Sequence, residues 1–156
     1  MRKIEEEILV LIVKAQAASD EAKVHYGHLE WDDGFLKKVG EDPYKTSFFY
    51  NLKANYIKKA LRLCRKTNDI RIRYRIVIST NEKGQKSFIV YFSTHYGQVS
   101  FHSPWKEGLA MGLKPEGSVI SWTGKKSGSR KNCLRIQKAL GLSLLEEGGE
   151  GFKKKK

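Results

Sequence analysis

Three arginines occupy every second position of one apolar segment: Arg71, Arg73 and Arg75 alternate with isoleucine and tyrosine between Ile70 and Ile76. A period of two is typical of a half-buried strand, so we expect the three guanidinium groups on one face of a sheet. Because each arginine that meets a backbone phosphate displaces a condensed counterion, the pattern predicts nucleic-acid affinity that falls steeply with salt. The alternative is a solvated sheet face that binds nothing.

Two other segments add basic side chains to this candidate polyanion-binding set. The earlier group is Lys58, Lys59, Arg62, Arg65 and Lys66, and the later group is Lys125, Lys126, Arg130 and Lys131. Residues three or four apart on a helix are neighbours, so the earlier group predicts a basic ridge. If both groups converge with the arginine strand, they form one phosphate-contacting surface, on which Tyr74 or Tyr91 could also stack on unpaired bases.

A second candidate site is the polar trio Gln98, Ser100 and His102, which alternates with Val99 and Phe101 and is expected on one face of a strand. These side chains could line a small pocket, in which His102 would act as an acid or base near neutral pH. However, a serine and a histidine two residues apart on one strand lack the geometry of a hydrolase triad. We therefore assign no catalytic residue, and a hydrogen-bonded structural face is the alternative.

A third cluster holds potential metal ligands within nine positions. Its members are His25, His28, Glu30, Asp32 and Asp33. Carboxylates that hold Mg²⁺ beside a basic groove would suit a nuclease. Because no known metal motif has this spacing, we interpret the segment Val24–Gly34 as an ordered polar loop and assign no metal site or cofactor.

A basic loop, Gly124–Ser129, precedes the last predicted helix, where free backbone amides favour an anion. The loop lacks the glycine spacing of a phosphate-binding loop, so a flexible basic loop is the alternative interpretation. Ser129 is expected to cap the helix, since a serine oxygen can accept from amides of the first turn.

Charge is distributed unevenly along the 156 residues, whose formal net charge is +13. Residues 1–42 hold 6 basic and 10 acidic side chains, a net charge of −4, whereas residues 43–156 hold 24 and 7, a net charge of +17. A field this one-sided suggests a polyanionic partner. Cys64 and Cys133 are expected as buried free thiols of a cytoplasmic protein, with a disulfide as the alternative. The longest apolar run, Ile8–Val13, is too short to span a bilayer.

Two long helices are predicted from apolar residues at helical spacing. The first runs from near Arg2 to near Val24. The second runs from Tyr44 to Lys66, after a turn that ends at Pro43. Its predicted core stripe is Phe49, Leu52, Tyr56, Ala60 and Leu63.

Three strands, Ile70–Ile76, Ser87–Ser93 and Gln98–His102, are separated by turn signals and predict an antiparallel meander. A glycine-rich connection, a short strand at Val119–Trp122 and a helix over Arg130–Leu140 that stops at Gly141 would follow. The expected fold is therefore α+β, with an antiparallel sheet of about four strands packed against two or three helices. We expect a single domain over residues 1–145 and a disordered, basic-ended tail over 146–156.

The strand Gly97-Gln98-Val99-Ser100-Phe101-His102, followed by Trp122, Gly124 and the basic segment Arg130–Lys138, resembles a pattern in small uncharacterised proteins of bacteriophages and mobile elements. The resemblance covers roughly residues 86–140. It implies an accessory role in replication, host takeover or defence evasion, in the host cytoplasm, and supplies no catalytic residue.

Three functions remain open from the sequence. The leading hypothesis is a non-enzymatic accessory protein that binds nucleic acid through the basic surface and contacts phosphate more than sequence. The second is an anti-defence inhibitor that binds a host nucleic-acid-handling complex, such as a CRISPR effector, or sequesters a nucleotide signal. The third is a metal-dependent nuclease that uses the cluster of His25 to Asp33. No membrane partner is expected, and a homodimer could form through an unpaired sheet edge.

Overall fold

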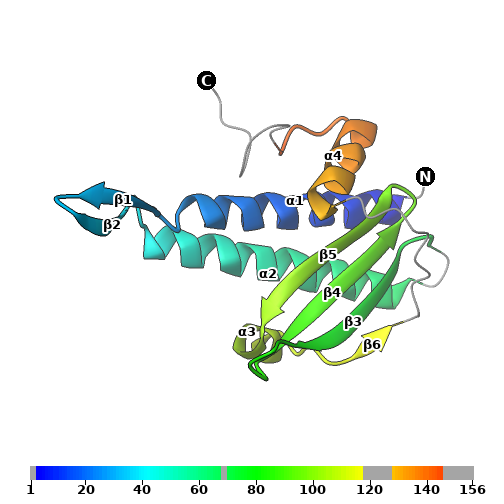
Figure 1. Cartoon of the computed structure of the whole chain (residues 1–156). Helices are drawn as coiled ribbons and strands as arrows, with labels where there is room; N and C mark the ends of the chain where they lie inside the picture. Colours follow the sequence, from blue (N-terminus) through cyan, green and yellow to red (C-terminus); the bar gives the residue numbers. More distant parts are fainter. Residues whose placement is uncertain (1–2, 68–69, 118–127, 146–156) are drawn as a thin grey trace.

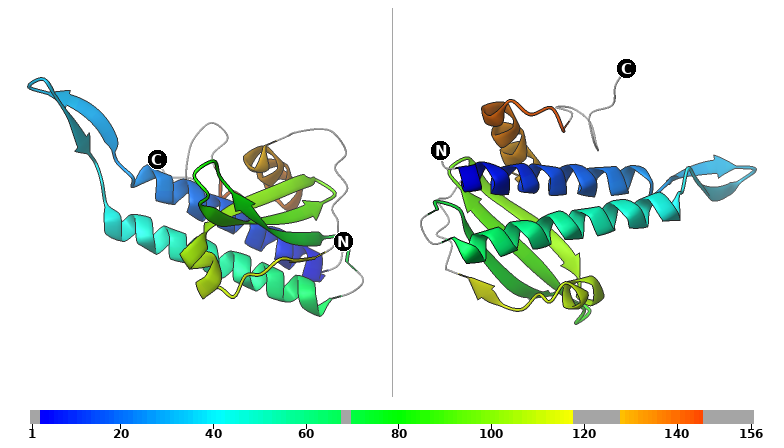
Figure 2. Two further views of the ribbon diagram at one scale, coloured as in Figure 1. Left: turned by 60° about the horizontal axis from the view of Figure 1, so that its bottom comes forward. Right: turned by 180° about the vertical axis from the view of Figure 1, so that it is seen from behind.

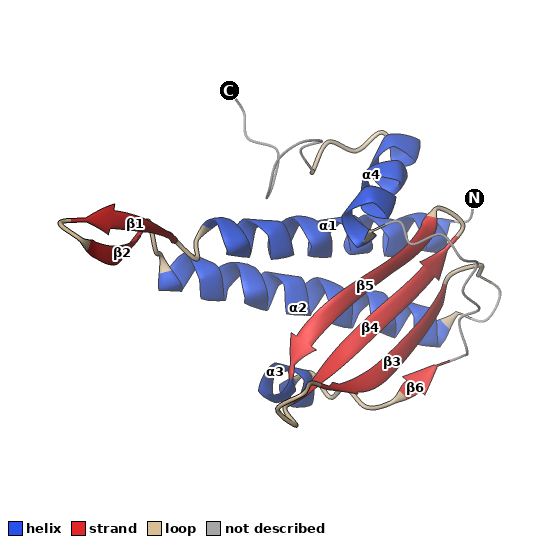
Figure 3. Cartoon of the chain, viewed as in Figure 1, coloured by secondary structure: helices blue, strands red, loops and turns tan. Residues whose placement is uncertain are grey.

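The computed structural model describes residues 3–67, 70–117 and 128–145, which form a layer of helices on one face of an antiparallel sheet (Figure 1). The helices are α1 (Lys3–Val24), α2 (Pro43–Lys66), α3 (Trp105–Ala110) and α4 (Ser129–Leu140). The strands are β1 (His28–Asp32), β2 (Phe35–Val39), β3 (Arg73–Thr80), β4 (Lys86–Thr94), β5 (Gly97–Pro104) and β6 (Glu116–Gly117). This arrangement confirms the predicted α+β fold, as the colouring by element type in Figure 3 shows.

The helical layer is built on α1 and α2, which run side by side in opposite directions (Figure 2). Asp42 caps α2, because its carboxylate accepts a hydrogen bond from the backbone N–H of Lys45 at 3.1 Å, and Pro43 occupies the first turn. The predicted core stripe of α2 is confirmed at Ala60, and its members Tyr56 and Leu63 are partly buried against the core, but the other fully buried positions lie one residue further along the helix. The buried positions are Lys53, Ile57, Ala60, Leu61 and Cys64. The reason is that α2 packs against both α1 and the sheet, so the side of the helix that is buried depends on both contacts.

The main sheet has the order β5-β4-β3-β6, with every neighbouring pair antiparallel. The predicted meander of β3, β4 and β5 is confirmed, although the first strand begins at Arg73 and continues to Thr80. Asn81 supports the turn after β3, since its side-chain oxygen accepts from the backbone N–H groups of Lys83 and Gln85. The inner face of the sheet carries the core side chains, including Ile76, Phe88 and Phe101.

Two other predictions about the elements were wrong. The segment near residue 30 is a β-hairpin rather than a loop, because Asp33 and Gly34 both take the positive φ angles, 47° and 81°, that suit a tight hairpin turn. The connection after β5 contains helix α3, whose Trp105 ring stacks on Phe88 at 4.7 Å. The predicted strand Val119–Trp122 and the predicted tail over 146–156 lie outside the described residues.

Both cysteines are buried free thiols, as predicted. Burial raises the pKa of Cys64 to about 12 and also raises the pKa of Cys133. The disulfide alternative is therefore wrong. Gly141 ends α4 in the left-handed conformation, φ 68°, which confirms the predicted helix stop.

Side chains from two helices cover the outer edge of β5. Asn132 of α4 donates its side-chain N–H to the carbonyl oxygen of Gln98 at 2.7 Å, and Ser129 accepts from the backbone N–H of Ser100 at 2.9 Å. Lys53 of α2 donates to the carbonyl oxygen of His102 at 2.9 Å. These bonds use the backbone groups with which a further strand would pair. The edge of β5 is thus not an open route to a homodimer.

We predict that Lys53 makes stability depend on pH. Its side chain is 8% exposed, and its pKa is lowered from 10.5 to about 8, mainly by burial and partly by the charge of Lys23. Since the unfolded chain keeps this proton to higher pH than the folded chain does, stability rises as pH increases from about 8 towards 10.5. The variant Lys53→Met lacks this titration.

The measurement is urea unfolding of both proteins at pH 7, 8 and 9. The wild-type unfolding free energy should gain about 1 kcal/mol on that of the variant between pH 8 and pH 9. Titration of Cys64 and Cys133 occurs in both proteins and cancels in the difference. A difference that does not change with pH would contradict the assignment.

Candidate nucleic-acid interface

The outer face of the sheet, which points away from α1 and α2, brings the arginine strand and the polar trio together. Alternation along β3, β4 and β5 turns the buried residues inward and their neighbours outward. The register then aligns outward residues in rows across the strands: Arg73, Ser93 and Gln98; Arg75, Tyr91 and Ser100; Val77, Ile89 and His102. Neighbouring strands lie about 4.8 Å apart, so each row spans about 10 Å. Two clusters that the sequence left separate therefore share one face.

Within the described residues, no helix packs over this outer face (Figures 1 and 2). Helices α1 and α2 lie behind the sheet, α3 contacts the inward-facing Phe88, and α4 follows the edge of β5. Arg73 and Arg75 are exposed, and Tyr91 between the outer strands is half-buried by its neighbours. We call this surface, with residues Arg73, Arg75, Tyr91, Gln98, Ser100 and His102, the open sheet face.

Arg71 lies beside the open sheet face, just before β3. Its neighbours Ile70 and Ile72 are buried, and Arg71 itself is exposed. Arg73 donates a hydrogen bond to the carbonyl oxygen of Ile70, which fixes the start of the strand. All three arginines are therefore accessible at one end of the sheet.

The basic ridge on α2 is exposed along its length, but it points in another direction. Its members, Lys58, Lys59, Arg62, Arg65 and Lys66, are all exposed, and Arg65 alone reaches the sheet in a contact described below. The ridge approaches the open sheet face only near the C-terminal end of α2, because Lys66 and Arg71 are five positions apart in the chain. The basic ridge and the arginine strand therefore come close only at the C-terminal end of α2, and they do not form one flat surface.

Arg65 is bound within the fold at that end. It forms an ion pair with Glu116 of β6 and lies over the ring of Tyr74, with 5.9 Å between the guanidinium carbon and the ring centre. The Tyr74 hydroxyl also donates to Glu116 at 3.3 Å. Tyr74 therefore serves this contact, and Tyr91 is the tyrosine that shares the face of the arginines.

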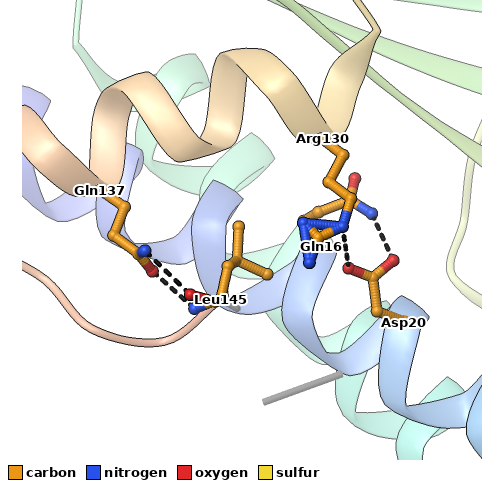
Figure 4. Close-up of polar contacts among 5 residues, drawn as sticks. All are labelled: Gln16, Asp20, Arg130, Gln137 and Leu145. Carbon is orange, nitrogen blue, oxygen red and sulfur yellow. Dashed lines mark hydrogen bonds and ion pairs between the residues drawn. The ribbon is translucent and has the colours of Figure 1, made fainter. Parts of the chain in front are cut away.

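Arg130 connects two helices through an ion pair and is partly exposed. Its Nε lies 3.4 Å from the carboxylate of Asp20, which is 4% exposed and also accepts from the side-chain amide of Gln16 at 2.8 Å (Figure 4). Lys131, the next residue, is exposed. Lys125 and Lys126 lie outside the described residues. Of the later basic group, the structure thus leaves Lys131 accessible and assigns Arg130 to packing.

The polar trio anchors the edge of the sheet. Its backbone carries the contacts from Asn132, Ser129 and Lys53, and the hydroxyl oxygens of Ser100 and Ser129 are 3.2 Å apart. The predicted cap at Ser129 was wrong: Ser129 is the first residue of α4, after Gly128, and no side chain caps the helix. Its hydroxyl bonds to β5 instead, a long-range contact that no local pattern encodes.

The potential metal ligands form no metal site among the side chains that the structure describes. His25 stacks on Phe49 at 5.7 Å and lies 3.5 Å from the carboxylate of Glu21, whereas Glu30 stands opposite Lys37 on the ribbon. The side chains of His28 and Asp32 are outside the described part of the structure. Among the side chains that are described, no three His, Cys, Asp or Glu residues group as a metal site.

Comparison with known proteins gives no match: no family pattern fits the chain, and no curated protein or solved structure is significantly similar to it. None of the helices in the described ranges has the length and apolar character needed to cross a bilayer.

We predict that Arg130 contributes to stability and not to ligand binding. Replacing it in Arg130→Leu leaves the buried carboxylate of Asp20 without its ion pair, which should cost about 3 kcal/mol of unfolding free energy. The measurement is urea unfolding, with Lys131→Leu as the control, since this neighbour is exposed and should change stability by about 0.5 kcal/mol or less. Equal effects of the two substitutions would contradict the assignment.

Proposed function

We propose that this chain binds single-stranded nucleic acid across the open sheet face, without catalysis. The observation that carries the proposal is the row of Arg75, Tyr91 and Ser100, beside Arg73, on a sheet face that no described helix covers. Such a row combines charge for phosphate, an aromatic ring for a base and polar groups for the sugar.

Charge supports a polyanionic ligand. Residues 43–156, which include the whole main sheet and α2, carry a net charge of +17. Arg71, Arg73 and Arg75 lie at one end of the sheet, and Lys66 approaches them from α2. A backbone that crosses this end meets several cations at once, and release of its counterions favours binding.

Shape supports a single strand over a duplex. Tyr91 lies on the central strand of β3, β4 and β5, and its half-buried side chain is on the open sheet face. Bases of a duplex are stacked inside the helix and cannot meet this ring, whereas unpaired bases can. His102, exposed at the edge of the same face, adds a second ring within about 10 Å.

The biological setting is part of the proposal. The resemblance of residues 86–140 to bacteriophage and mobile-element proteins favours an accessory role that acts on nucleic acid in the host cytoplasm. Docking on a host nucleic-acid-handling complex would use the same basic surface. The two functions differ in whether free nucleic acid binds tightly, which the following experiment measures.

The first test concerns the three arginines. Replacing Arg71, Arg73 and Arg75 by alanine removes three phosphate contacts, so affinity for a labelled single strand should fall at least 10-fold near physiological salt. The slope of log affinity against log salt should decrease by about 2, because each contact contributes about 0.7 on a single strand. Fluorescence anisotropy across a salt series measures both quantities.

The control removes the same charge elsewhere. Lys83, Lys106 and Lys114 are exposed and lie in or near the β3–β4 turn and α3, away from the arginine end of the sheet. Their triple alanine variant should reduce affinity less than 3-fold. Equal losses of affinity in the two variants would show that binding depends on net charge alone and not on the position of the arginines. Weak wild-type binding to every nucleic acid would refute the proposal and favour a protein or nucleotide partner.

The second test concerns strand preference. Tyr91→Ala removes the stacking ring and should cost a single strand about 10-fold in affinity, since one base–aromatic stack is worth roughly 1–3 kcal/mol. Binding of a duplex of the same length, which uses the arginines alone, should change less than 2-fold. Tyr91→Phe keeps the ring and should bind like wild type. Equal losses on single and double strands would contradict the stacking role.

A further inference from the structure

Exposed apolar side chains are concentrated in one part of the chain. Among the described residues, six of the eight large exposed hydrophobic side chains lie between residues 26 and 48. They are Tyr26, Trp31, Phe35, Leu36, Tyr44 and Phe48. Trp31, Phe35 and Tyr44 are 74%, 76% and 89% exposed. This much exposed apolar area in one part of a chain is typical of an interaction site.

The centre of this surface is the β1–β2 ribbon, which extends beyond the ends of α1 and α2 (Figures 1 and 2). Trp31 and Leu36 stand opposite each other on one side of the ribbon, and Phe35 lies on the other side, next to the turn. Within the described chain no third strand joins the ribbon. Because an isolated two-stranded ribbon is marginally stable in water, this one gains from a partner that covers its apolar side chains.

Exposed apolar side chains also occur at the start of α2, next to the base of the ribbon. Tyr44 and Phe48 are exposed one turn apart on the helix. The Phe48 ring contacts the Phe49 ring edge to face at 5.2 Å, and Phe49 in turn stacks on His25. This ring cluster fixes the base of the ribbon, so the exposed rings stand on a rigid support.

The small net charge of the ribbon favours a second copy of the chain as its partner. Residues 28–39 hold 3 acidic and 2 basic side chains, a net charge of −1, in a chain of +13. Phosphate therefore has little attraction to the ribbon. Two copies of the chain repel each other through their basic bodies, and that repulsion is least here.

The available area matches what a stable dimer needs. Aromatic side chains present roughly 150–250 Å² each, so the five exposed side chains other than Phe35, four of which are aromatic, offer on the order of 600 Å². A standard interface buries about 800 Å² on each partner. The backbone of the ribbon supplies the remainder.

We infer that the β1–β2 ribbon and the start of α2 form the interface of a two-fold homodimer. In this dimer Trp31, Leu36 and Phe48 of one copy pack against the same surface of the other. The basic ridge and the open sheet face stay outside the interface. The inference is independent of nucleic-acid binding, because it rests on a different surface and a different interaction.

Sedimentation velocity over a concentration series tests the dimer. The wild type should self-associate with a Kd of about 10 µM or lower, and higher salt should tighten it by screening the basic bodies, whereas salt weakens nucleic-acid binding. The variant Trp31→Ser/Phe35→Ser/Leu36→Ser should be a monomer with unchanged helix content by circular dichroism. Leu109→Ser, which removes an exposed leucine from α3, is the matched control and should remain a dimer.

A distance measurement keeps the inference testable if the triple variant misfolds. A spin label at Lys37→Cys should report an intermolecular distance below about 40 Å, whereas a label at Lys83→Cys, in the turn after β3, should report a longer one. A wild type that stays monomeric at about 100 µM would overturn the inference and leave the ribbon to a different protein partner. A triple variant that still dimerises, or a shorter distance at Lys83→Cys, would also overturn it.

Discussion

The rest of the structure depends on one constraint: the main sheet buries only one of its faces. Phe88, Phe92 and Phe101 project from that face into the core that α1 and α2 complete. Because side chains alternate along each strand, burying these rings forces Arg73, Arg75 and Tyr91 to the opposite side. A register shift of one residue would exchange the two sets. The apolar core therefore determines where the charged face lies.

Much of this could be predicted from local patterns. The alternation in residues 70–76 predicted an arginine face, and the meander and the two long helices are as expected. The hairpin near residue 30 carried a signal too, since Asp33-Gly34 between Trp31 and Phe35 is a strong hairpin turn sequence, yet the polar residues around it favoured a loop interpretation. Its exposed rings were missed for the same reason.

Contacts between distant segments could not be predicted. Ser129 and Ser100 are 29 positions apart, and the pair of Arg130 with Asp20 joins α4 to α1. Sequence spacing gives no information on which basic residue meets a buried carboxylate, so Arg130 was grouped with the ligand-binding set. Gln137 makes a similar contact: its side chain bonds to the backbone of Leu144 and Leu145, which holds the segment after α4 against the helix (Figure 4). Such polar contacts determine where α4 lies, and α4 in turn covers the edge of β5.

The length of helix α2 sets the distance between the ribbon and the basic end of the molecule. Its 24 residues span about 36 Å without a break, from Pro43 near the ribbon to Lys66 near the arginines. A dimer joined at the ribbons would hold its two basic ends roughly two helix lengths, about 70 Å, apart. Short oligonucleotides could then occupy one end only, while a longer strand could reach both and gain from the high local concentration of the second site. The length of one uninterrupted helix would thus set the shortest strand that the assembly can hold at two points.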